Sequence, residues 1–500
     1  MTPVVANLSE YLTLSAQVDG AKTAIIDGER RMSYARLDSA ATALAAGLAG
    51  RGINAGDRVM LLLGNRSEFV ISLFGVLRLG AVAVPVNPSL APDEIRHAVA
   101  HVEPSLIITE PDVAEKAEQS AEGTEILVGG SSAWADLLAS GRATAPNLKP
   151  QADSDALAVL LFTSGSTGRP KAAMLTHRSL SANIEQLRLL HNPSATAADD
   201  VVLGVLPLSH VYSLNTVMTL TIAVGATLLL EPRFSPSGTL DLVRAQHVTV
   251  VAGAPPIYVA WTAEPDLAES LSGVRLLTSG ASALPSALFE QYSTLTGKTI
   301  WEGYGLTECS PVVATALASE RAKPGSVGKP LPGVEVRLVD PSGDPGEDRA
   351  GEIYVRGPLL FSGYWPDGHD GPDEQGWWGT GDVALVDADG DLRLVDRTKE
   401  LIIVSGFNVY PREVERVIEE IPGVAEVAVV GVAHPYSGEA VKAFISTRPG
   451  ADLTSDEVVA ACHERLARFK APTLVEFLPE LPHSGSGKIA RGKLRKMAGA

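Results

Sequence analysis

Several features that mark particular classes of protein are scarce in this chain of 500 residues. It has two cysteines, Cys309 and Cys462, too few for a disulfide framework or a cysteine-rich metal site, so a reducing, cytoplasmic location is expected. Acidic residues outnumber basic ones by 59 to 41, and the net charge of −18 argues against a nucleic-acid partner. The chain does not open with a basic segment followed by an apolar one, so no signal peptide is predicted.

Long apolar runs are also missing. The most apolar stretch, 217–230, is shorter than a membrane-spanning helix and is interrupted by threonines, so no membrane span is predicted. What the chain has instead is length and many turns. Its 500 residues exceed what one hydrophobic core usually supports, and 47 glycines and 33 prolines are typical of a turn-rich globular protein. We therefore expect at least two domains.

The first part of the chain alternates apolar strands with helical patterns. A helix is predicted to begin at the cap Ser33, and another to cover 69–79 and end at Gly80. Short buried strands are predicted at 57–63, 81–86, 105–109 and 125–128. Strand, helix and strand with short joints indicate parallel βαβ units. The fold class expected is therefore α/β, with a large N-terminal domain built from layered βαβ sheets.

A charged joint, 396–400, separates this part from a second, smaller unit. Beyond the joint, the pattern predicts strands at 401–404, 424–432 and 441–445 and helices from Pro411 and over 455–466. These elements make a compact α+β unit of small-domain size. We expect a large domain at 1–397 and a small, mobile domain at 398–500.

One loop combines a buried strand with a dense set of hydrogen-bond donors. The apolar run 156–162 predicts the strand, and Lys171 closes the segment. Between them stand four hydroxyl residues and two glycines, namely Thr163, Ser164, Gly165, Ser166, Thr167 and Gly168. Backbone N–H groups and hydroxyls in such a loop can surround a polyphosphate, although a flexible Gly/Ser turn is the plainer alternative.

Two common nucleotide motifs are absent. A P-loop needs a Gly-Lys pair followed by Ser or Thr, and the one Gly-Lys near a Gly/Ser-rich stretch, Gly487-Lys488, is followed by Ile489. No Gly-x-Gly-x-x-Gly follows a predicted strand, so the usual dinucleotide fingerprint is missing as well. If the loop binds phosphate, it belongs to a different type of nucleotide-binding protein.

The loop resembles the phosphate loop of the adenylate-forming superfamily, which includes acyl-CoA synthetases, firefly luciferase and the adenylation domains of peptide synthetases. Other segments similar to the motifs of this family follow in the family's order, at 207–215, 276–285, 301–308, 378–382, 392–400, 405–407 and 482–488. The last one departs from the usual pattern, because His483 and Ser484 stand where the family has arginine and threonine. Ser486, Gly487 and Lys488 are intact.

The resemblance implies a set of nucleotide contacts. Taken alone, each has a plainer interpretation as a tight turn, a core tyrosine or a solvated carboxylate. The residues expected to bind ATP are Thr163, Ser164, Gly165, Ser166, Thr167, Gly168 and Lys171 at the phosphates, Gly280, Ala281, Ser282, Glu302, Gly303 and Tyr304 around the adenine, and Asp382 and Arg397 at the ribose.

The catalytic groups implied by the resemblance are Lys488, Glu308, Thr307 and His210. Glu308 would hold Mg²⁺, which binds phosphates together with one or two carboxylates and water. Thr307 would contact phosphate, and Lys488 would lie near the reacting oxygens. His210 would border the carboxylate of the substrate, although a structural histidine is the alternative.

The expected reaction has two steps with different spatial demands. A carboxylic acid attacks the α-phosphate of ATP to give an acyl adenylate and pyrophosphate, and the thiol of CoA then displaces AMP. In the family, the small domain rotates between the steps about a hinge at the position of Lys399. This rotation would bring Ser405, Gly406 and Phe407 to the site, where the missing side chain of Gly406 leaves room for the thiol arm.

We therefore expect an ATP-dependent carboxylic acid–CoA ligase that uses ATP, Mg²⁺ and CoA. Apolar or small pocket candidates, Tyr258, Ala283 and Val312, suit a medium- or long-chain fatty acid or an aryl-propenoic acid. The alternatives are a fatty acyl-AMP ligase that loads a carrier protein, a light-emitting luciferase and a non-catalytic nucleotide sensor. Monomer and homodimer remain equally open.

Overall fold

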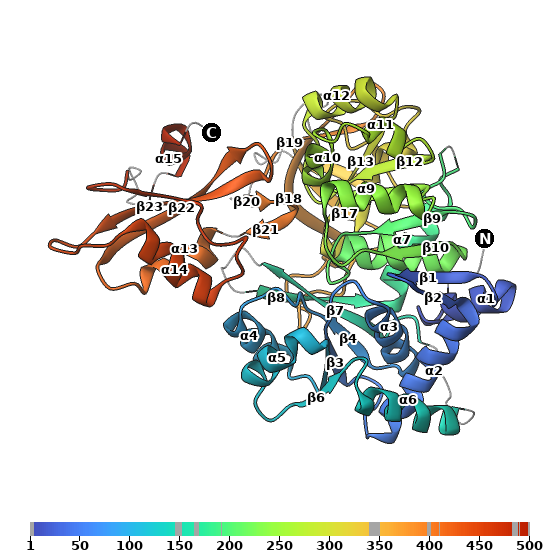
Figure 1. Cartoon of the computed structure of the whole chain (residues 1–500). Helices are drawn as coiled ribbons and strands as arrows, with labels where there is room; N and C mark the ends of the chain where they lie inside the picture. The colour runs from blue at the N-terminus through green and yellow to red at the C-terminus, as the bar shows by residue number, and fades with distance from the viewer. Residues whose placement is uncertain are drawn as a thin grey trace.

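The computed structural model describes residues 5–145, 153–164, 170–191, 193–339, 351–397, 402–409, 411–482, 489 and 491–498. Within them the chain forms two bodies of unequal size, with the small domain projecting to one side of the large one (Figure 1). The large domain carries three β-sheets with helices between and around them, and the small domain carries a fourth sheet. The α/β fold class predicted from the sequence is confirmed.

A six-stranded sheet with the order β6-β5-β3-β4-β7-β8 forms one layer of the large domain. Its strands are β3 (Arg58–Leu62), β4 (Val82–Pro85), β5 (Leu106–Thr109), β6 (Glu125–Val128), β7 (Leu157–Ser164) and β8 (Pro170–Thr176). The first five strands are parallel, as the βαβ pattern predicted. The sequence did not predict β8, which pairs antiparallel with β7 from Leu157↔Thr176 to Ser164↔Pro170.

A nine-stranded sheet with the order β15-β14-β13-β12-β11-β9-β10-β1-β2 forms another layer. Its strands are β1 (Thr23–Asp27), β2 (Arg30–Ser33), β9 (Val201–Gly204), β10 (Thr227–Leu230), β11 (Val250–Gly253), β12 (Leu276–Ser279), β13 (Ile300–Gly305), β14 (Val312–Thr315) and β15 (Lys329–Pro330). The six central strands are parallel. The turns that follow β12 and β13 therefore lie at the same edge of the sheet, where open α/β sheets bind ligands.

The largest hydrophobic core lies between these two sheets. Val59 and Leu61 of β3 point into it, while their neighbours Met60 and Leu62 point to the opposite face, as the period of a strand requires. Helices that contribute to this core are α1 (Glu10–Asp19), α2 (Tyr34–Gly50), α3 (Ser67–Leu79), α6 (Ser132–Thr144), α7 (His177–Arg188), α8 (Leu220–Val224) and the π-helix η3 (Tyr212–Thr219).

The predicted ends of two of these helices are confirmed. The Ser33 hydroxyl accepts a hydrogen bond from Arg36 N at the start of α2, and Gly80 adopts φ 80° at the end of α3. Helices α4 (Pro92–Val102) and α5 (Ala114–Ser120) cover the outer face of the six-stranded sheet. The outer face of the nine-stranded sheet is covered by α9 (Pro236–Ala245), α10 (Pro255–Trp261), α11 (Leu267–Ser270) and α12 (Ser286–Thr296).

A four-stranded antiparallel sheet completes the large domain. Its strands are β16 (Glu335–Val339), β17 (Gly351–Arg356), β18 (Trp377–Val386) and β19 (Leu392–Arg397). Short 3₁₀ turns occur at η1 (Pro111–Val113), η4 (Thr307–Cys309) and η5 (Ala316–Ala318). Within the part of the chain that the structure describes, every helix is too short or too polar to cross a bilayer.

The small domain is a five-stranded sheet covered on both faces. Its strands are β20 (Ile402–Val404), β21 (Phe407–Val409), β22 (Val424–His434), β23 (Gly438–Thr447) and β24 (Leu474–Phe477). Helices α13 (Pro411–Glu419) and α14 (Ser455–Arg465) pack on one face, and α15 (Arg491–Met497) packs on the other. Ser405 and Gly406 join β20 to β21 with φ of 52° and 82°, the positive values that a two-residue hairpin turn needs.

Candidate active site

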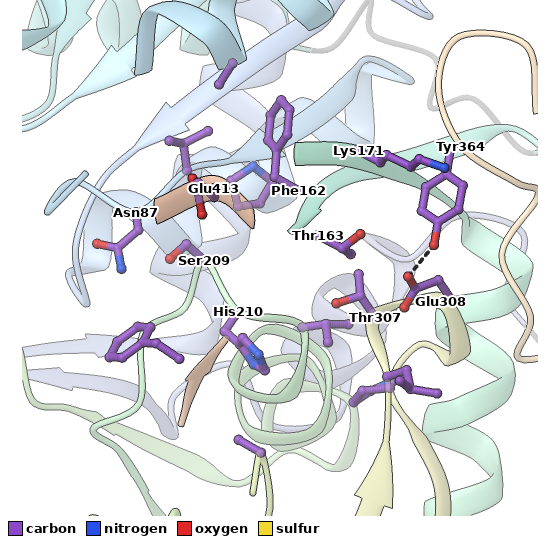
Figure 2. Close-up of a pocket in the computed structure, with 18 of the residues that line it drawn as sticks. Asn87, Phe162, Thr163, Lys171, Ser209, His210, Thr307, Glu308, Tyr364 and Glu413 are labelled. Atoms are coloured by element: carbon purple, nitrogen blue, oxygen red, sulfur yellow. Dashed lines mark hydrogen bonds between the residues drawn. The ribbon is translucent and has the colours of Figure 1, made fainter. Parts of the chain in front are cut away.

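A cavity of about 1200 Å³ opens between the two domains. The end of β7, the turns after β12 and β13 and the segment 207–212 supply walls from the large domain, and α13 and the segment 469–470 supply walls from the small one. Figure 2 shows Thr163, Thr307 and Glu308 converging on one part of it and His210 and Ser209 on another. The cavity therefore gathers several residues that the sequence placed far apart.

The entrance to the predicted phosphate loop lies on the cavity wall that the end of β7 forms. Thr163 pairs with Lys171 across β7 and β8, and both residues line the cavity. Lys171 Nζ lies 2.6 Å from Asp370 Oδ2 and 4.8 Å from the centre of the Tyr364 ring. Its hydrogen bond and its charge lower the pKa of Asp370. Gly165, Ser166, Thr167 and Gly168 lie outside the described residues, as does the side chain of Ser164.

Glu308 stands on the 3₁₀ turn that follows β13. Its side chain is buried, yet it lines the cavity next to Thr307. The hydroxyl of Tyr364 donates a hydrogen bond to Glu308 Oε1 at 2.6 Å, drawn as the dashed line in Figure 2. Tyr364 was not predicted as a site residue. It touches the two predicted charged groups of this wall, since its ring faces Lys171 and its hydroxyl donates a hydrogen bond to Glu308.

A second tyrosine–carboxylate pair lies on the wall formed by the nine-stranded and four-stranded sheets. Tyr304 of β13 donates a hydrogen bond from its hydroxyl to Asp382 Oδ2 of β18 at 2.8 Å, and both residues are buried. Burial and the neighbouring charge of Asp382 raise the pKa of Tyr304, which therefore stays a donor. Asp382 pairs with Arg397 in the β18–β19 ladder, but the side chain of Arg397 is outside the described residues.

The turn after β12 forms a close-packed wall beside Tyr304 and Asp382. Gly280 and Ala281 line the cavity, and Ala281 adopts φ 68°. A Cβ atom at Gly280 would lie 3.3 Å from the ring of Tyr212, a close contact that glycine avoids. The Tyr212 hydroxyl lies 3.0 Å from Thr278 Oγ1, which fixes the ring in place.

Two predicted nucleotide contacts stand behind the wall. Glu302 does not line the cavity: its Oε1 accepts a hydrogen bond from Leu284 N at 2.8 Å, and burial raises its pKa to about 7. Glu302 therefore supports the turn after β12 from behind. Ser282 is half-buried and also lies off the cavity, whereas Gly303 lines it.

The prediction for the acid pocket was wrong at two of three positions. Tyr258 is buried in the core and donates its hydroxyl to Thr278 O at 2.6 Å, and Ala283 is exposed to solvent, so neither lines the cavity. Val312 does line it. Apolar character does not separate a pocket residue from a core residue, and the ring of Tyr258 fills the space beside Gly253.

His210 lies on the cavity wall between the segment 207–209 and η3. Burial lowers its pKa to about 4, so the imidazole is uncharged near pH 7. Its Nδ1 accepts a hydrogen bond from Tyr212 N at 3.4 Å. His210 therefore offers the cavity a neutral polar ring rather than a positive charge.

The small domain contributes its hairpin turn to the same cavity. A Cβ atom at Gly406 would lie 3.6 Å from the Cβ atoms of both Ala254 and Ala281, so the turn reaches the wall beside β12. Phe407 lines the cavity and stacks on Phe469, with ring centres 4.4 Å apart. The two predicted lysines, Lys399 and Lys488, lie outside the described residues.

Comparison with known families gives two matches that divide the chain. The family described as "AMP-binding enzyme" matches residues 12–365, and the one described as "AMP-binding enzyme C-terminal domain" matches residues 413–488. Among curated proteins, a long-chain-fatty-acid–CoA ligase of Yersinia pestis is 36% identical over 93% of this chain and 89% of its own length. A feruloyl-CoA synthase of an Amycolatopsis species is 37% identical over 98% and 99%.

Solved structures of similar proteins cover nearly the whole chain. An o-succinylbenzoate CoA synthetase from Bacillus subtilis, bound with a product analogue, superposes with a TM-score of 0.85 at 26% identity over 97% of this chain and 98% of its own. The ATP-bound MatB protein from Rhodopseudomonas palustris superposes with a TM-score of 0.74 at 31% identity over 99% of both chains. The more similar sequence thus gives the lower structural score.

Proposed function

This chain belongs to the AMP-binding enzyme family, and from that premise we propose that it joins an apolar carboxylic acid to coenzyme A at the expense of ATP. It is an AMP-forming acid–thiol ligase, and its curated relatives are named as a CoA ligase and a CoA synthase. The observation that carries the proposal is the single cavity that brings together Thr163, the Thr307–Glu308 turn and the Gly406–Phe407 turn. These groups come from both domains, so a movement of one domain against the other would change which groups face the cavity.

In the first step, a carboxylate oxygen of the acid attacks the α-phosphorus of ATP, and the bond from that phosphorus to pyrophosphate breaks. We assign Thr163, Lys171 and Thr307 to the phosphates, because they line one wall of the cavity. Asp382 and Tyr304 are assigned to the nucleoside end, next to the turn at Gly280. Prearranged donors of this kind stabilise charge that develops in the transition state. Lys488 is assigned to the reacting oxygens on the family resemblance alone.

The Glu308 carboxylate and the neighbouring hydroxyl groups of Thr163 and Thr307 suit a magnesium ion. No three His, Cys, Asp or Glu side chains come together as a ready-made cation site among the described residues. Mg²⁺ typically binds to one or two carboxylates while substrate phosphates and water complete its shell, and Glu308 supplies one such carboxylate. A bound Mg²⁺ would neutralise charge on the phosphates.

Tyr364 is assigned to positioning Glu308. A buried carboxylate can rotate, and its hydrogen bond from the Tyr364 hydroxyl fixes one oxygen so that the group faces the cavity in one orientation. A hydroxyl donor does this without adding a positive charge that would compete with a cation.

In the second step, the thiol sulfur of CoA attacks the carbonyl carbon of the acyl adenylate, the bond to AMP breaks, and the thiol proton is released. The approach of Gly406 to Ala281 supports the assignment of the present domain arrangement to this step. We propose the domain boundary at 397/398 and the hinge at Lys399.

The acid itself is proposed to be a medium- or long-chain fatty acid or an aryl-propenoic acid, because the curated relatives include ligases named for both classes. The neutral imidazole of His210 and the apolar side chains of Val211 and Val312 face this part of the cavity. An apolar acid fits such walls better than an acid with a second charge.

The proposal is tested by supplying the purified full-length chain with ATP, Mg²⁺, CoA and one acid at a time. Hexadecanoate, dodecanoate and ferulate are the acids to compare, with succinate as the polar control. We expect pyrophosphate release that depends on the acid, and an acyl-CoA of the expected mass. Pyrophosphate without any thioester would favour the carrier-loading alternative. Nucleotide binding without pyrophosphate release for any acid would favour a sensor and contradict the proposal.

A further inference from the structure

A buried lysine of the small domain bridges the two domains. Lys470 Nζ lies 2.7 Å from Oε1 of Glu94, in α4 of the large domain, and 2.9 Å from Oε1 of Glu413, in α13 of the small domain. The three side chains are 10%, 9% and 8% exposed, so all three charges are largely withdrawn from water. Removing the lysine from such a group leaves two carboxylates buried and uncompensated.

The charges of this bridge are unequal, because one ammonium faces two carboxylates. Burial alone would lower the pKa of Lys470, but attraction to Glu413 and Glu94 outweighs burial and the pKa lies above its ordinary value. The second oxygen of Glu413 is buried and has no hydrogen-bond partner among the described residues. Without the ammonium, carboxylates from different domains would face each other at close range and repel.

Glu94 is held in place independently of the small domain. Its other oxygen, Oε2, accepts a hydrogen bond from Ala91 N at 2.9 Å, where α4 begins with Pro92. The large domain therefore presents a preformed acceptor, and the lysine of the small domain meets it. A fixed partner makes the bridge specific for one relative placement of the domains.

The bridge adjoins the turn that the small domain places in the cavity. Phe469 precedes Lys470 and stacks on Phe407, and Gly406 of the same turn lies against Ala281. Holding Lys470 at Glu94 therefore also holds the Ser405–Phe407 turn at the cavity wall.

We propose that Lys470 is a positioning residue for the second half-reaction, because its bridge to Glu94 holds the small domain where the Ser405–Phe407 turn meets the cavity. The proposal rests on the proposed function, since a two-step ligase must adopt this arrangement for one step and leave it for the other. Lys470 acts through the placement of the turn and not on the reacting atoms.

The test measures the two half-reactions separately with the acid that the wild-type enzyme accepts, hexadecanoate or ferulate. Exchange of pyrophosphate into ATP reports the first step, and thioester formation from the synthetic acyl adenylate and CoA reports the second. For Lys470→Met we expect the second step to fall by about 10- to 100-fold and the first to stay within about threefold. Glu94→Gln, which keeps the acceptor for Ala91 N, should lower the second step by a smaller factor.

Lys442→Met is the matched control. Lys442 is also a largely buried lysine of the small domain, and it pairs with Glu476 at 2.8 Å, but that pair does not leave the domain. Its replacement should change the two half-reactions equally, if at all. A selective loss of the second step in this control would contradict the assignment to the interdomain bridge.

Combining variants separates the bridge from a general packing role. In Lys470→Met, Glu94 and Glu413 repel, so adding Glu94→Gln should recover about three- to tenfold of the second step. A packing role predicts further loss instead. The proposal is overturned if Lys470→Met reduces both steps equally, if it leaves the second step intact, or if the double variant is no better than the single one.

A distance measurement tests whether Lys470 holds the two domains together, independently of the proposed function. Val18 and Tyr436 lie in different domains and are 88% and 69% exposed, and both native cysteines are buried. Spin labels on Val18→Cys and Tyr436→Cys should give a narrower distance distribution with Lys470 present than in Lys470→Met. The same distribution in both proteins would contradict the bridge, whereas absence of exchange with every acid would contradict only the proposed function.

Discussion

The large domain and the junction between the domains both bury carboxylates, but they give them different partners. In the large domain, Glu308 accepts a hydrogen bond from a tyrosine hydroxyl at 2.6 Å, and Asp382 accepts one at 2.8 Å. At the junction, Glu94 and Glu413 share the ammonium of Lys470. A hydroxyl orients a carboxylate and leaves its charge, whereas an ammonium neutralises it. The first kind of partner suits a group that must meet a ligand, and the second suits a contact that must hold two bodies together.

The largest effect should follow from removing the charge of Glu308. Glu308→Gln keeps the size of the side chain and an acceptor for Tyr364, but it cannot offer Mg²⁺ a carboxylate. We expect acid-dependent pyrophosphate release to fall by on the order of 10²–10³-fold and the Mg²⁺ concentration for half-maximal rate to rise. Glu335→Gln, at an exposed ion pair with Arg356, is the control. An unchanged Mg²⁺ titration would remove Glu308 from the metal site.

A smaller effect is expected at the second tyrosine–carboxylate pair. Asp382→Asn retains an acceptor for Tyr304 but loses the charge and one strong acceptor for the ribose hydroxyls. The KM for ATP should rise by about tenfold, while the KM for the acid stays nearly constant. Steady-state kinetics with each substrate varied in turn provide the measurement. Equal increases in both KM values would indicate a general disturbance of the cavity and not a nucleoside contact.

Tyr364→Phe tests whether the orientation of the Glu308 carboxylate matters when its charge is kept. The variant keeps the ring beside Lys171 and removes the hydroxyl that holds Glu308. We expect kcat for adenylation to fall by about three- to tenfold, with a smaller change in the Mg²⁺ requirement than in Glu308→Gln. Tyr436→Phe, at an exposed tyrosine, should have no effect. If Tyr364→Phe matches wild type, the hydrogen bond plays no part in positioning Glu308.

The last prediction concerns stability and not rate, at a carboxylate that has neither a tyrosine hydroxyl nor an ammonium as a partner among the described residues. Burial raises the pKa of Glu302 from 4.5 to about 7, and its carboxylate accepts a backbone hydrogen bond. Between these pH values the folded chain keeps a proton that the unfolded chain has lost, so the free energy of unfolding falls as the pH rises from about 5 to about 7.

Glu302→Gln does not titrate and keeps an acceptor for Leu284 N. Its free energy of unfolding should therefore vary less with pH over this window, by on the order of 1–3 kcal/mol relative to wild type. Denaturant titrations at pH 5, 6, 7 and 8 provide the comparison. Parallel curves for the two proteins would show that Glu302 does not carry this pH dependence.

Much of the fold could be predicted because its signals are local. The strands β3 to β6 are short apolar runs between turns, and α2 and α3 are delimited by a serine cap and a glycine. Strand β8 was missed because 170–176 begins with Pro170 and Lys171 and has no clear alternation. Its partner, β7, lies next to it in the chain, but only the paired structure shows that the two strands are antiparallel.

The residues of the candidate site also divide into those with a local signal in the sequence and those without one. Gly280 and Glu308 follow strand ends and Tyr304 lies near the end of β13, all in recognisable motifs, so the sequence could single them out as candidates. Tyr364 and Lys470 could not be identified, because each acts on a carboxylate that is distant in the chain and no spacing connects them. Lys470 meets Glu94 across a sequence separation of 376 residues. Contacts of this kind depend on how the sheets and domains pack, which local patterns do not encode.

The antiparallel pairing of β7 with β8 has a consequence for how this gene can vary. Ser164 and Pro170 are the last paired residues, so five residues separate the paired ends in the chain. A residue inserted into or deleted from either paired segment would shift the register by one, and such a shift turns every side chain beyond it to the opposite face. It would therefore move Thr163 or Lys171 away from the cavity. A residue added between the paired ends does not by itself change the register. Natural or laboratory variants should therefore rarely gain or lose a residue inside 157–164 or 170–176.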